Sequence, residues 1–211
     1  MAAAKPPKGA PTSGAAGAET RERLIDACRA CLRDDGIAGV SARAIARHGD
    51  LNQALVFYHF GSVDGLLQAT ATEDSQRRAA LYADRLGEVT TLAQLVAVGQ
   101  AIHAVESERG STAVLAQLLA GSASSEGLRA AVLAGMEPWT SLVAAAVDRV
   151  VAGTPLAEAA PTDEVAFAIA SLFLGMEMFA GLDPDHDRAA SLFASLETVA
   201  GLFDALVGRR A

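Results

Sequence analysis

The chain has 211 residues, of which 51% are hydrophobic and only 5% aromatic, and its formal net charge is −8. That length suffices for one or two domains around a sizeable core. Alanine dominates and runs of alternating β-branched and polar residues are absent, which excludes an all-β fold. The acidic balance excludes a polybasic nucleic-acid coat protein. The charge is uneven, because residues 1–67 carry eight basic and seven acidic side chains and residues 68–211 carry nine and 18.

The two cysteines, Cys28 and Cys31, are too few for a four-thiolate zinc site or a disulfide framework. They lie in the middle of a predicted helix, on its apolar stripe, whereas redox pairs of this spacing occupy a helix N-terminus. We therefore predict that both are small core residues. Residues 1–18 contain no apolar segment of the signal-peptide type, so we expect a cytoplasmic protein.

One stretch, residues 165–182, approaches the length of a membrane span. However, Glu177 lies inside it, and acidic residues flank it where anchoring cations would be expected. A helix that is apolar on every side is also typical of a protein interior. We therefore expect no membrane segment.

The chain begins with residues 1–18, which are rich in Ala, Gly and Pro and predict a disordered arm. The first helix is expected to start near Thr20, as its N-cap, and to end at Gly36. Side chains that cap the next three helices are predicted at Ser41, Asn52 and Ser62.

The rest of the chain keeps a helical pattern, with Gly, Ser and Pro separators between the segments. Pro138 falls inside one of these segments and is expected to kink or split it. The sequence thus predicts an all-α fold of about nine helices. The fourth runs to about residue 86, and the later ones span residues 91–108, 111–121, 125–152, 162–182 and 187–208.

Two short segments near the N-terminus predict a helix-turn-helix. Ser41 begins the first, which runs to about His48, and Asn52 begins the second after a tight turn. In such a pair the second helix enters the major groove with its N-terminal residues against base edges. Arg43 and Arg47 lie one turn apart on the preceding helix, and guanidinium groups bind bases or phosphates.

These residues resemble the TetR-type transcriptional regulators. The matching features are the first helix, Gly36, the Val40-Ser41 pair, Ile45-Ala46, Leu51 before a capping residue, and the aromatic-x-His-aromatic close at residues 57–60. Total length and an all-helical remainder also agree. The resemblance implies a DNA-binding head over residues 19–66 and an effector-binding and dimerisation domain over residues 67–211. It covers the head closely and the remainder in outline.

The resemblance also implies which residues bind DNA. The base-reading face corresponds to residues 52–55, and phosphate contacts are implied at Phe57 and His59. Three departures stand out: Asp50 replaces a usual glycine, Phe57 lacks a tyrosine hydroxyl and Val63 replaces a lysine. From the residues themselves, Phe57 and Phe60 are expected to face the core. The predicted DNA-binding residues are Ser41, Arg43, Arg47, Asn52, Gln53, Ala54, Leu55, Phe57, Tyr58 and His59.

A second site is implied between the head and the C-terminus. The family encloses an apolar pocket for a small molecule there, with few polar groups in its wall. Core packing explains any one of the candidate residues equally well. The predicted effector-pocket residues are His103, Glu106, Gln117, Met136 and Trp139.

The last two helices predict a dimer interface. Apolar residues in the last helix are spaced 4, 3, 4 and 3, which is the a/d pattern of a helix that packs lengthwise on a partner. The resemblance implies the same four-helix arrangement around a two-fold axis. The alternative is that both helices only cover the core of one chain. The predicted interface residues are Phe167, Phe173, Leu192, Leu196, Val199, Phe203 and Leu206.

No phosphate loop, nucleophile elbow or zinc-ligand helix is present in the sequence, so we predict no enzyme, no metal and no cofactor. His103 and Glu106 share one helix face, but a second such pair is missing. Residues 183–187 read as an acidic connector. The sequence predicts a one-component regulator that represses as a homodimer on a palindromic operator and leaves it on binding a small apolar or amphipathic effector. The alternative is a helical binding or interaction protein of the same fold that no longer binds DNA.

Overall fold

The computed structural model describes residues 13–158, 161–180 and 188–208, and these form nine helices and no strand. The all-α prediction is therefore confirmed. The helices are α1 (Ser13–Gly39), α2 (Ala42–Gly49), α3 (Ala54–Phe60), α4 (Val63–Gly87), α5 (Leu92–Arg109), α6 (Ser111–Ser122), α7 (Glu126–Val151), α8 (Thr162–Ala180) and α9 (Arg188–Leu206).

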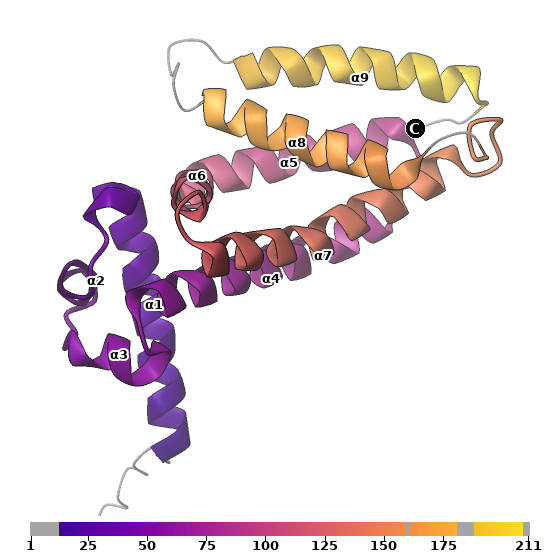
Figure 1. Ribbon diagram of the computed structural model, residues 1–211. Helices are drawn as coiled ribbons and strands as arrows, with labels where there is room; N and C mark the ends of the chain where they lie inside the picture. The colour runs from indigo at the N-terminus through magenta and orange to yellow at the C-terminus, as the bar shows by residue number, and fades with distance from the viewer. Residues whose placement is uncertain (1–12, 159–160, 181–187, 209–211) are drawn as a thin grey trace, which may run out of the picture.

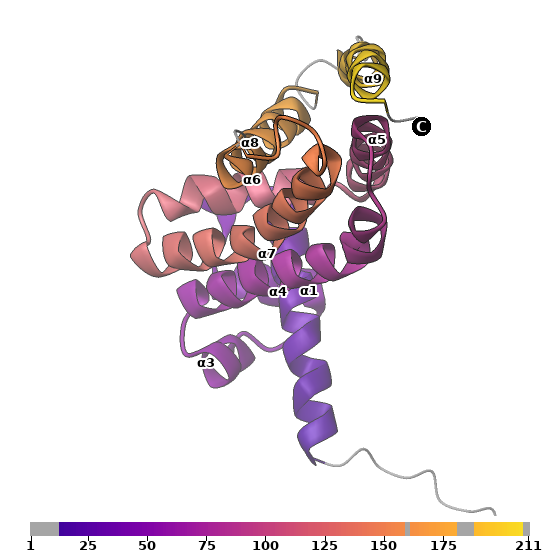
Figure 2. The ribbon, with the colours of Figure 1, turned by 90° about the vertical axis from the view of Figure 1, so that its right-hand side faces the viewer.

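The first three helices gather at one end of the molecule, and the long helices extend away from them (Figure 1). Helices α4 and α7 lie side by side, and α6 bridges their near ends to α1 (Figures 1 and 2). Helix α9 forms the outer edge and packs chiefly on α5. We call α1–α3 the head and α4–α9 the body. The head lies at the opposite end of the molecule from α8 and α9 (Figure 1).

The start of the first helix differs from the prediction. Helix α1 begins at Ser13, so residues 13–18 are helical, and residues 1–12 lie outside the described residues. Thr20 is not an N-cap, because its hydroxyl donates to the Ala16 carbonyl 2.9 Å away, inside the helix. The regular helix is interrupted at Gly36, where the sequence predicted its end, and α1 continues beyond this kink to Gly39; Gly36 has φ of 69°, a left-handed conformation that glycine adopts without steric cost.

Side-chain caps fix the next helices where the sequence placed them. The Ser41 hydroxyl accepts a hydrogen bond from the Ala44 amide at 3.1 Å, and the Ser62 hydroxyl accepts one from Gly65 at 2.9 Å. Each satisfies a backbone donor that the first helical turn leaves unpaired. Pro138 does not split its helix, because α7 continues from Glu126 to Val151.

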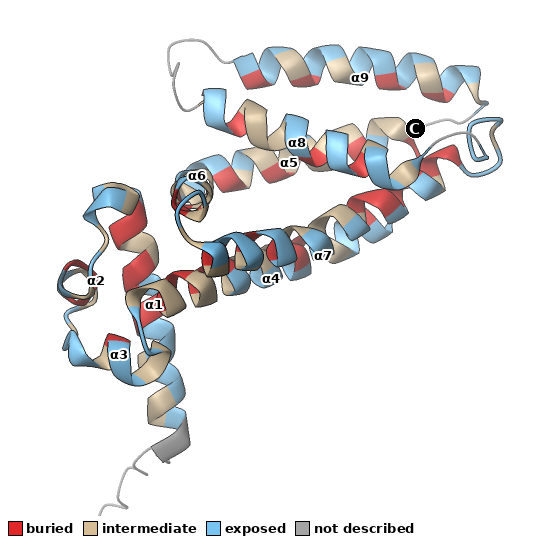
Figure 3. Ribbon diagram, in the orientation of Figure 1, coloured by how far each residue is buried: buried red, intermediate tan, exposed pale blue. Residues whose placement is uncertain are grey.

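The buried side chains form two clusters, which follow each other along α4 and α7 (Figure 3). The first joins the head to the body, since Ile45 and Val56 belong to the same cluster as Leu118 and Val132. The second lies at the far end, around Tyr82 and the second half of α7. One apolar core therefore crosses the boundary at residue 66 that the sequence suggested.

Two helices, α7 and α9, are long and apolar enough to cross a membrane by composition alone. The stretch that raised this alternative in the sequence corresponds to α8 instead. Helix α7 packs along α4 and α8, and α9 packs on α5. Both therefore take part in the helical bundle, as the core helices of a globular protein do.

Candidate nucleic-acid interface and ligand cavity

Helices α2 and α3 are joined by a tight turn at Asp50. Asp50 has φ of 49°, and it is the one non-glycine residue with positive φ among the described residues. Aspartate tolerates this left-handed conformation better than most residues do. The Leu51 amide donates to the Ala46 carbonyl at 2.9 Å and closes the turn. Asp50 thus fills the place for which the resemblance implies glycine.

Helix α3 begins two residues after its predicted cap. Asn52 nevertheless binds the backbone amides at the start of α3. Its Oδ1 accepts a hydrogen bond from the Ala54 amide at 2.9 Å, and its carbonyl accepts one from the Leu55 amide. Val56 is fully buried against the core of the head, whereas Leu55 is half-buried. The two short helices therefore pack as a pair, which leaves the opposite face of α3 to solvent.

The outer face of α3 carries the side chains that the sequence assigned to DNA. Asn52, Gln53 and Ala54 are exposed, and Tyr58 is 82% exposed. His59 is half-buried, with its ring centroid 4.9 Å from that of Tyr58 in an edge-to-face arrangement. An amide, a phenol and an imidazole are thus presented together at the surface of the head.

The prediction for Phe57 as a core residue is wrong, because its side chain is 53% exposed. Phe57 follows the buried Val56 in the helix, and neighbouring residues point about 100° apart around the helix axis. The Phe57 side chain is therefore directed away from the core. The prediction for Phe60 is right. Phe60 packs against the core of the head, and the Arg21 guanidinium lies 5.2 Å from its ring centroid.

The two arginines of α2 differ in their surroundings. Arg43 and Ser41 are exposed. Arg47 is also at the surface, but its Nη2 lies 2.9 Å from Asp35 Oδ2. His48 Nε2 approaches the same carboxylate oxygen at 2.9 Å, and this contact is the main reason that the pKa of Asp35 is lowered. Asp35 therefore partly neutralises the cationic end of α2.

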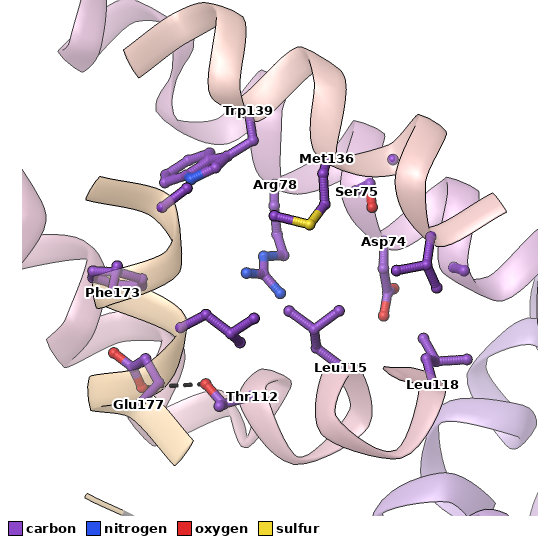
Figure 4. Close-up of a pocket in the computed structure, with 15 residues that line it drawn as sticks. Asp74, Ser75, Arg78, Thr112, Leu115, Leu118, Met136, Trp139, Phe173 and Glu177 are labelled. Atoms are coloured by element: carbon purple, nitrogen blue, oxygen red, sulfur yellow. Dashed lines mark hydrogen bonds between the residues drawn. The ribbon is translucent and has the colours of Figure 1, made fainter. Parts of the chain in front are cut away.

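A cavity of about 70 Å³ lies in the body, between α4, α6, α7 and α8 (Figure 4). Two of the five predicted pocket residues, Met136 and Trp139, line it. Most of the wall is apolar. The side chains that line it are Ala71, Asp74, Ser75, Arg78, Thr112, Leu115, Leu118, Val132, Met136, Trp139, Ala170, Phe173, Leu174 and Glu177, together with Gly135.

The polar groups of this cavity come from facing helices. Arg78 from α4 points toward its centre, and Glu177 from α8 lies at its edge beside Thr112 (Figure 4). Glu177 is buried and accepts from the Thr112 hydroxyl at 3.2 Å. The sequence analysis did not propose these three residues, although a carboxylate inside an apolar segment was the signal that marked Glu177.

His103 and Glu106 were predicted to line the pocket, but they lie behind its wall. His103 hydrogen-bonds Glu177 through Nδ1, and Glu106 accepts from the Tyr82 hydroxyl at 2.7 Å and approaches Arg78 Nε at 3.3 Å. Burial raises the pKa of Tyr82 to about 12, and the neighbouring Glu106 adds to the shift. The two residues have separate partners and do not converge on one metal.

Gln117 was also predicted as a pocket residue, but its side chain is not among those that line this cavity. Its Oε1 accepts a hydrogen bond from the Ile37 amide at 2.8 Å, so the side chain points into the junction between α1 and α2. A Cβ atom added to Gly36 would lie 3.3 Å from the same oxygen. The residue joins α6 to the head instead of contacting the cavity.

A second link joins the cavity wall to the head. Asp74, on the wall, forms a hydrogen-bonded ion pair with Arg29 of α1, and Arg29 also lies 3.6 Å from Glu73.

Cys28 and Cys31, on either side of Arg29, are both fully buried. Burial raises the pKa of Cys28 to about 12, which fits the predicted role as a core residue.

The predicted dimer seam is only partly at the surface. Phe173 lines the cavity and Phe203 packs against the second core cluster, and both side chains are half-buried. The buried stripe of α9 runs through Phe193 and Asp204, and the Asp204 carboxylate accepts from the Leu92 and Ala93 amides at the start of α5. The regular spacing did not show which way this stripe faces.

Several apolar side chains of α8 and α9 are exposed nonetheless. Phe167, Val199 and Leu206 of the predicted set are more than half exposed, and Leu192 and Leu196 are half-buried. Phe179, at 70%, is the most exposed phenylalanine. We call the exposed members the α8–α9 face; they are Phe167, Leu172, Met178, Phe179, Val199, Leu202 and Leu206.

The N-terminal domain matches known regulators. Residues 24–70 match the model of the family described as bacterial regulatory proteins, tetR family. The chain is 38% identical over 50 residues to the HTH-type transcriptional regulator BetI 2 from Chromohalobacter salexigens. That match spans 24% of this chain and 24% of the relative.

Solved structures extend the likeness to the whole fold. The fatty acid degradation regulator FadR from Bacillus halodurans is 13% identical with a TM-score of 0.72, over 92% of this chain and 96% of that one. FadR from Bacillus subtilis, in complex with stearoyl-CoA, is 12% identical with a TM-score of 0.68, over 85% of this chain and 96% of that one. The match over residues 24–70 shows that this chain carries the N-terminal domain of the bacterial regulatory proteins, tetR family, while the likeness over the rest of the chain is one of fold.

Proposed function

We propose that this protein is a cytoplasmic, one-component transcriptional repressor that binds an imperfect palindromic operator as a homodimer and leaves it when a small apolar or amphipathic molecule binds. The observation that carries the proposal is the outer face of α3. Tyr58 is exposed there and Gln53 is exposed at the N-cap just before the helix, while Val56 fixes the helix to the core. This is the arrangement that a recognition helix needs to enter a major groove.

The chemistry of this face supports DNA as the partner. Amide side chains such as those of Asn52 and Gln53 pair with adenine edges, and Tyr58, His59 and Arg43 offer donors to phosphates. The head has few cations, and Asp35 neutralises one of them, Arg47. We therefore expect modest affinity for non-specific DNA and a small salt dependence, with specificity coming from base contacts.

The α8–α9 face supports a homodimer. Isolated exposed apolar residues are common, but seven of them on two neighbouring helices are typical of an interface. An isologous contact through this face would place the two copies of α3 symmetrically, with centres one helical turn of DNA apart, about 34–36 Å. The operator is then expected to have two related half-sites.

The cavity supports control by a small molecule. Its volume of about 70 Å³ is far below the roughly 300–1,000 Å³ of a drug-sized site, so such an effector must move helices apart to enter. Helices α4 and α6 would move, and both hold the head, through the Arg29 pair with Asp74 and through Gln117. The effector shifts the equilibrium between two head positions only by its difference in affinity for them.

Selection of bound fragments from random duplex DNA by the purified protein tests the proposal. We expect enrichment of a two-fold symmetric sequence with half-sites one helical turn apart. A salt titration on the enriched duplex then gives the number of phosphate contacts. Absence of any enriched sequence at low salt would contradict the proposal. It would favour the alternative of a ligand-binding protein without DNA, which the exposed Phe57 and the half-buried Val63 in place of phosphate-binding groups also suggest.

A further inference from the structure

Three side chains with metal-binding groups meet where the end of α1 packs on α2. Cys31 and Asp35 lie one turn apart on α1, and His48 lies in the last turn of α2. Their Sγ, carboxylate and imidazole atoms are all within 4.8 Å of one another. Asp35 Oδ2 is 2.9 Å from His48 Nε2, and Cys31 Sγ is 3.7 Å from the same oxygen.

These separations fit the coordination sphere of a tetrahedral ion. Zinc bonds of about 2.3 Å to sulfur and about 2.0–2.2 Å to nitrogen and oxygen imply ligand atoms roughly 3.3–3.6 Å apart. The 3.7 Å between Cys31 Sγ and Asp35 Oδ2 is already close to this range, the 2.9 Å between Asp35 Oδ2 and His48 Nε2 must lengthen by about half an ångström, and the widest separation, up to 4.8 Å, must shorten by about one ångström through rotation of the side chains. The side chains of Asp35 and His48 are 31% and 18% exposed, so an ion from solvent has access to the cluster.

A carboxylate beyond the cluster completes the resemblance to a metal site. Asp34 Oδ2 lies 3.9 Å from His48 Nδ1, the ring nitrogen on the side away from Asp35. Metal-bound histidines usually donate this second N–H to an outer carboxylate, which fixes the orientation of the ring. A thiolate and an imidazole in the ligand set select zinc-type ions over magnesium or calcium.

We propose that Cys31, Asp35 and His48 form a binding site for a zinc-type divalent cation, with a solvent molecule in the fourth position. The thiol loses its proton to solvent when the thiolate binds the ion. Because the ligands come from α1 and α2, the ion holds α2, the first helix of the helix-turn-helix, against α1. Nothing in this site requires DNA, a dimer or an effector.

The site also has a consequence for Arg47. Its Nη2 lies 2.9 Å from the carboxylate oxygen that the ion would take. Occupation of that oxygen releases the guanidinium, whose side chain is 66% exposed, for contact with a phosphate. The cation is therefore expected to strengthen DNA binding, with about 0.9 added to the slope of log affinity against log salt for one more phosphate contact.

The test is a titration of the chelator-treated full chain with Co²⁺, followed by displacement with Zn²⁺. We expect one cobalt per chain, visible bands of tetrahedral cobalt and a thiolate charge-transfer band. The chain has two cysteines, so Cys31→Ser must abolish the charge-transfer band, whereas Cys28→Ala, the matched control, must keep it. His48→Gln, at a half-buried position, should weaken cobalt binding about 10-fold or more.

Two results would overturn the site: absence of a charge-transfer band in the native chain, or a band that survives Cys31→Ser and disappears in Cys28→Ala. Circular dichroism of each variant in chelator shows whether it is folded. The effect on Arg47 is measured separately, on random-sequence duplex DNA with and without Zn²⁺. Arg47→Gln should remove the increase in affinity, and an equal increase in Arg47→Gln or Cys31→Ser would contradict the release of Arg47.

Discussion

Gln117 and Ile37 are 80 residues apart in the chain, yet the Gln117 side-chain oxygen lies 2.8 Å from the Ile37 amide nitrogen. This bond ties α6, which borders the cavity, to the residue that follows the kink at Gly36 near the end of α1. It is a direct polar connection between the body and the head.

Loss of this bond should destabilise the fold. Gln117→Ala leaves the half-buried Ile37 amide without its acceptor, and we expect a loss of about 1–2 kcal/mol in the free energy of unfolding by urea titration. Gln117→Glu keeps the acceptor oxygens and serves as the control. Equal stability of the Ala variant and the native chain would mean that solvent replaces the bond at no cost.

Gln53 and His59 are expected to contribute differently to DNA binding. Gln53→Ala should relax the preference at one or two base pairs, at a cost of about 1–3 kcal/mol for the preferred operator. His59→Ala should weaken binding to all sequences alike. Competition binding with the selected operator and single-base variants measures both effects. Gln100→Ala, at an exposed position of α5, is the matched control. The opposite pattern would exchange the two roles.

The raised pKa of Tyr82 predicts how the free energy of unfolding changes at alkaline pH. This pKa is about 12 in the folded chain against 10.0 as a reference. The folded state therefore holds the phenolic proton more tightly, so its stabilising contribution is complete below pH 10 and is lost as the pH rises from 10 toward 12. A two-unit shift corresponds to about 3 kcal/mol. Urea titrations between pH 9 and 12 should show this decline, which Tyr82→Phe should reduce and the exposed control Tyr58→Phe should not.

Gly135 determines how closely α7 approaches α4. A Cβ atom at this position would lie 2.3 Å from Ser75 Oγ and 2.9 Å from Ser75 Cβ, which forces the two helices to shift. We expect Gly135→Ala to lower the unfolding free energy by about 1–3 kcal/mol. Gly17→Ala, where the added carbon meets nothing within 4 Å, should be neutral or slightly stabilising. Thermal unfolding of both variants makes the comparison.

The α8–α9 face predicts the oligomeric state. Leu202→Glu places a charge in the proposed interface, where it would lack a partner, and should shift sedimentation velocity profiles from dimer to monomer. Leu133→Glu is a matched control, because Leu133 on α7 is 63% exposed and Leu202 is 64% exposed. A dimer that tolerates Leu202→Glu but not Leu133→Glu would move the interface to α7.

Much of the fold was predictable from the sequence because its signals are local. Ser41 and Ser62 cap helices through hydrogen bonds to residues three positions away, and Gly36 kinks α1 through its own backbone. The start of α1 was not predictable in this way. Thr20 was expected to begin the helix, but the Ala- and Gly-rich residues 13–18 before it are already helical.

The candidate sites were predictable only in part. The exposed residues of α3 follow from helical periodicity, since Val56 must face the core. Phe57 was misplaced because an aromatic side chain alone does not reveal its direction. In α9 a regular 4-3-4-3 spacing fits more than one face of the helix. Packing on α5 decided that Phe193 and Phe203 turn inward while Leu202 turns outward.

The amino-acid sequence by itself determined most of the helices, the caps at Ser41 and Ser62 and the pairing of α2 with α3, because each depends on residues close to one another in the chain. The tertiary structure decided which distant side chains meet. It joined Gln117 to Ile37, Arg29 to Asp74 and His48 to Cys31 and Asp35, and it opened a cavity beside Glu177. These contacts depend on how whole helices pack, and no local pattern of residues contains that information.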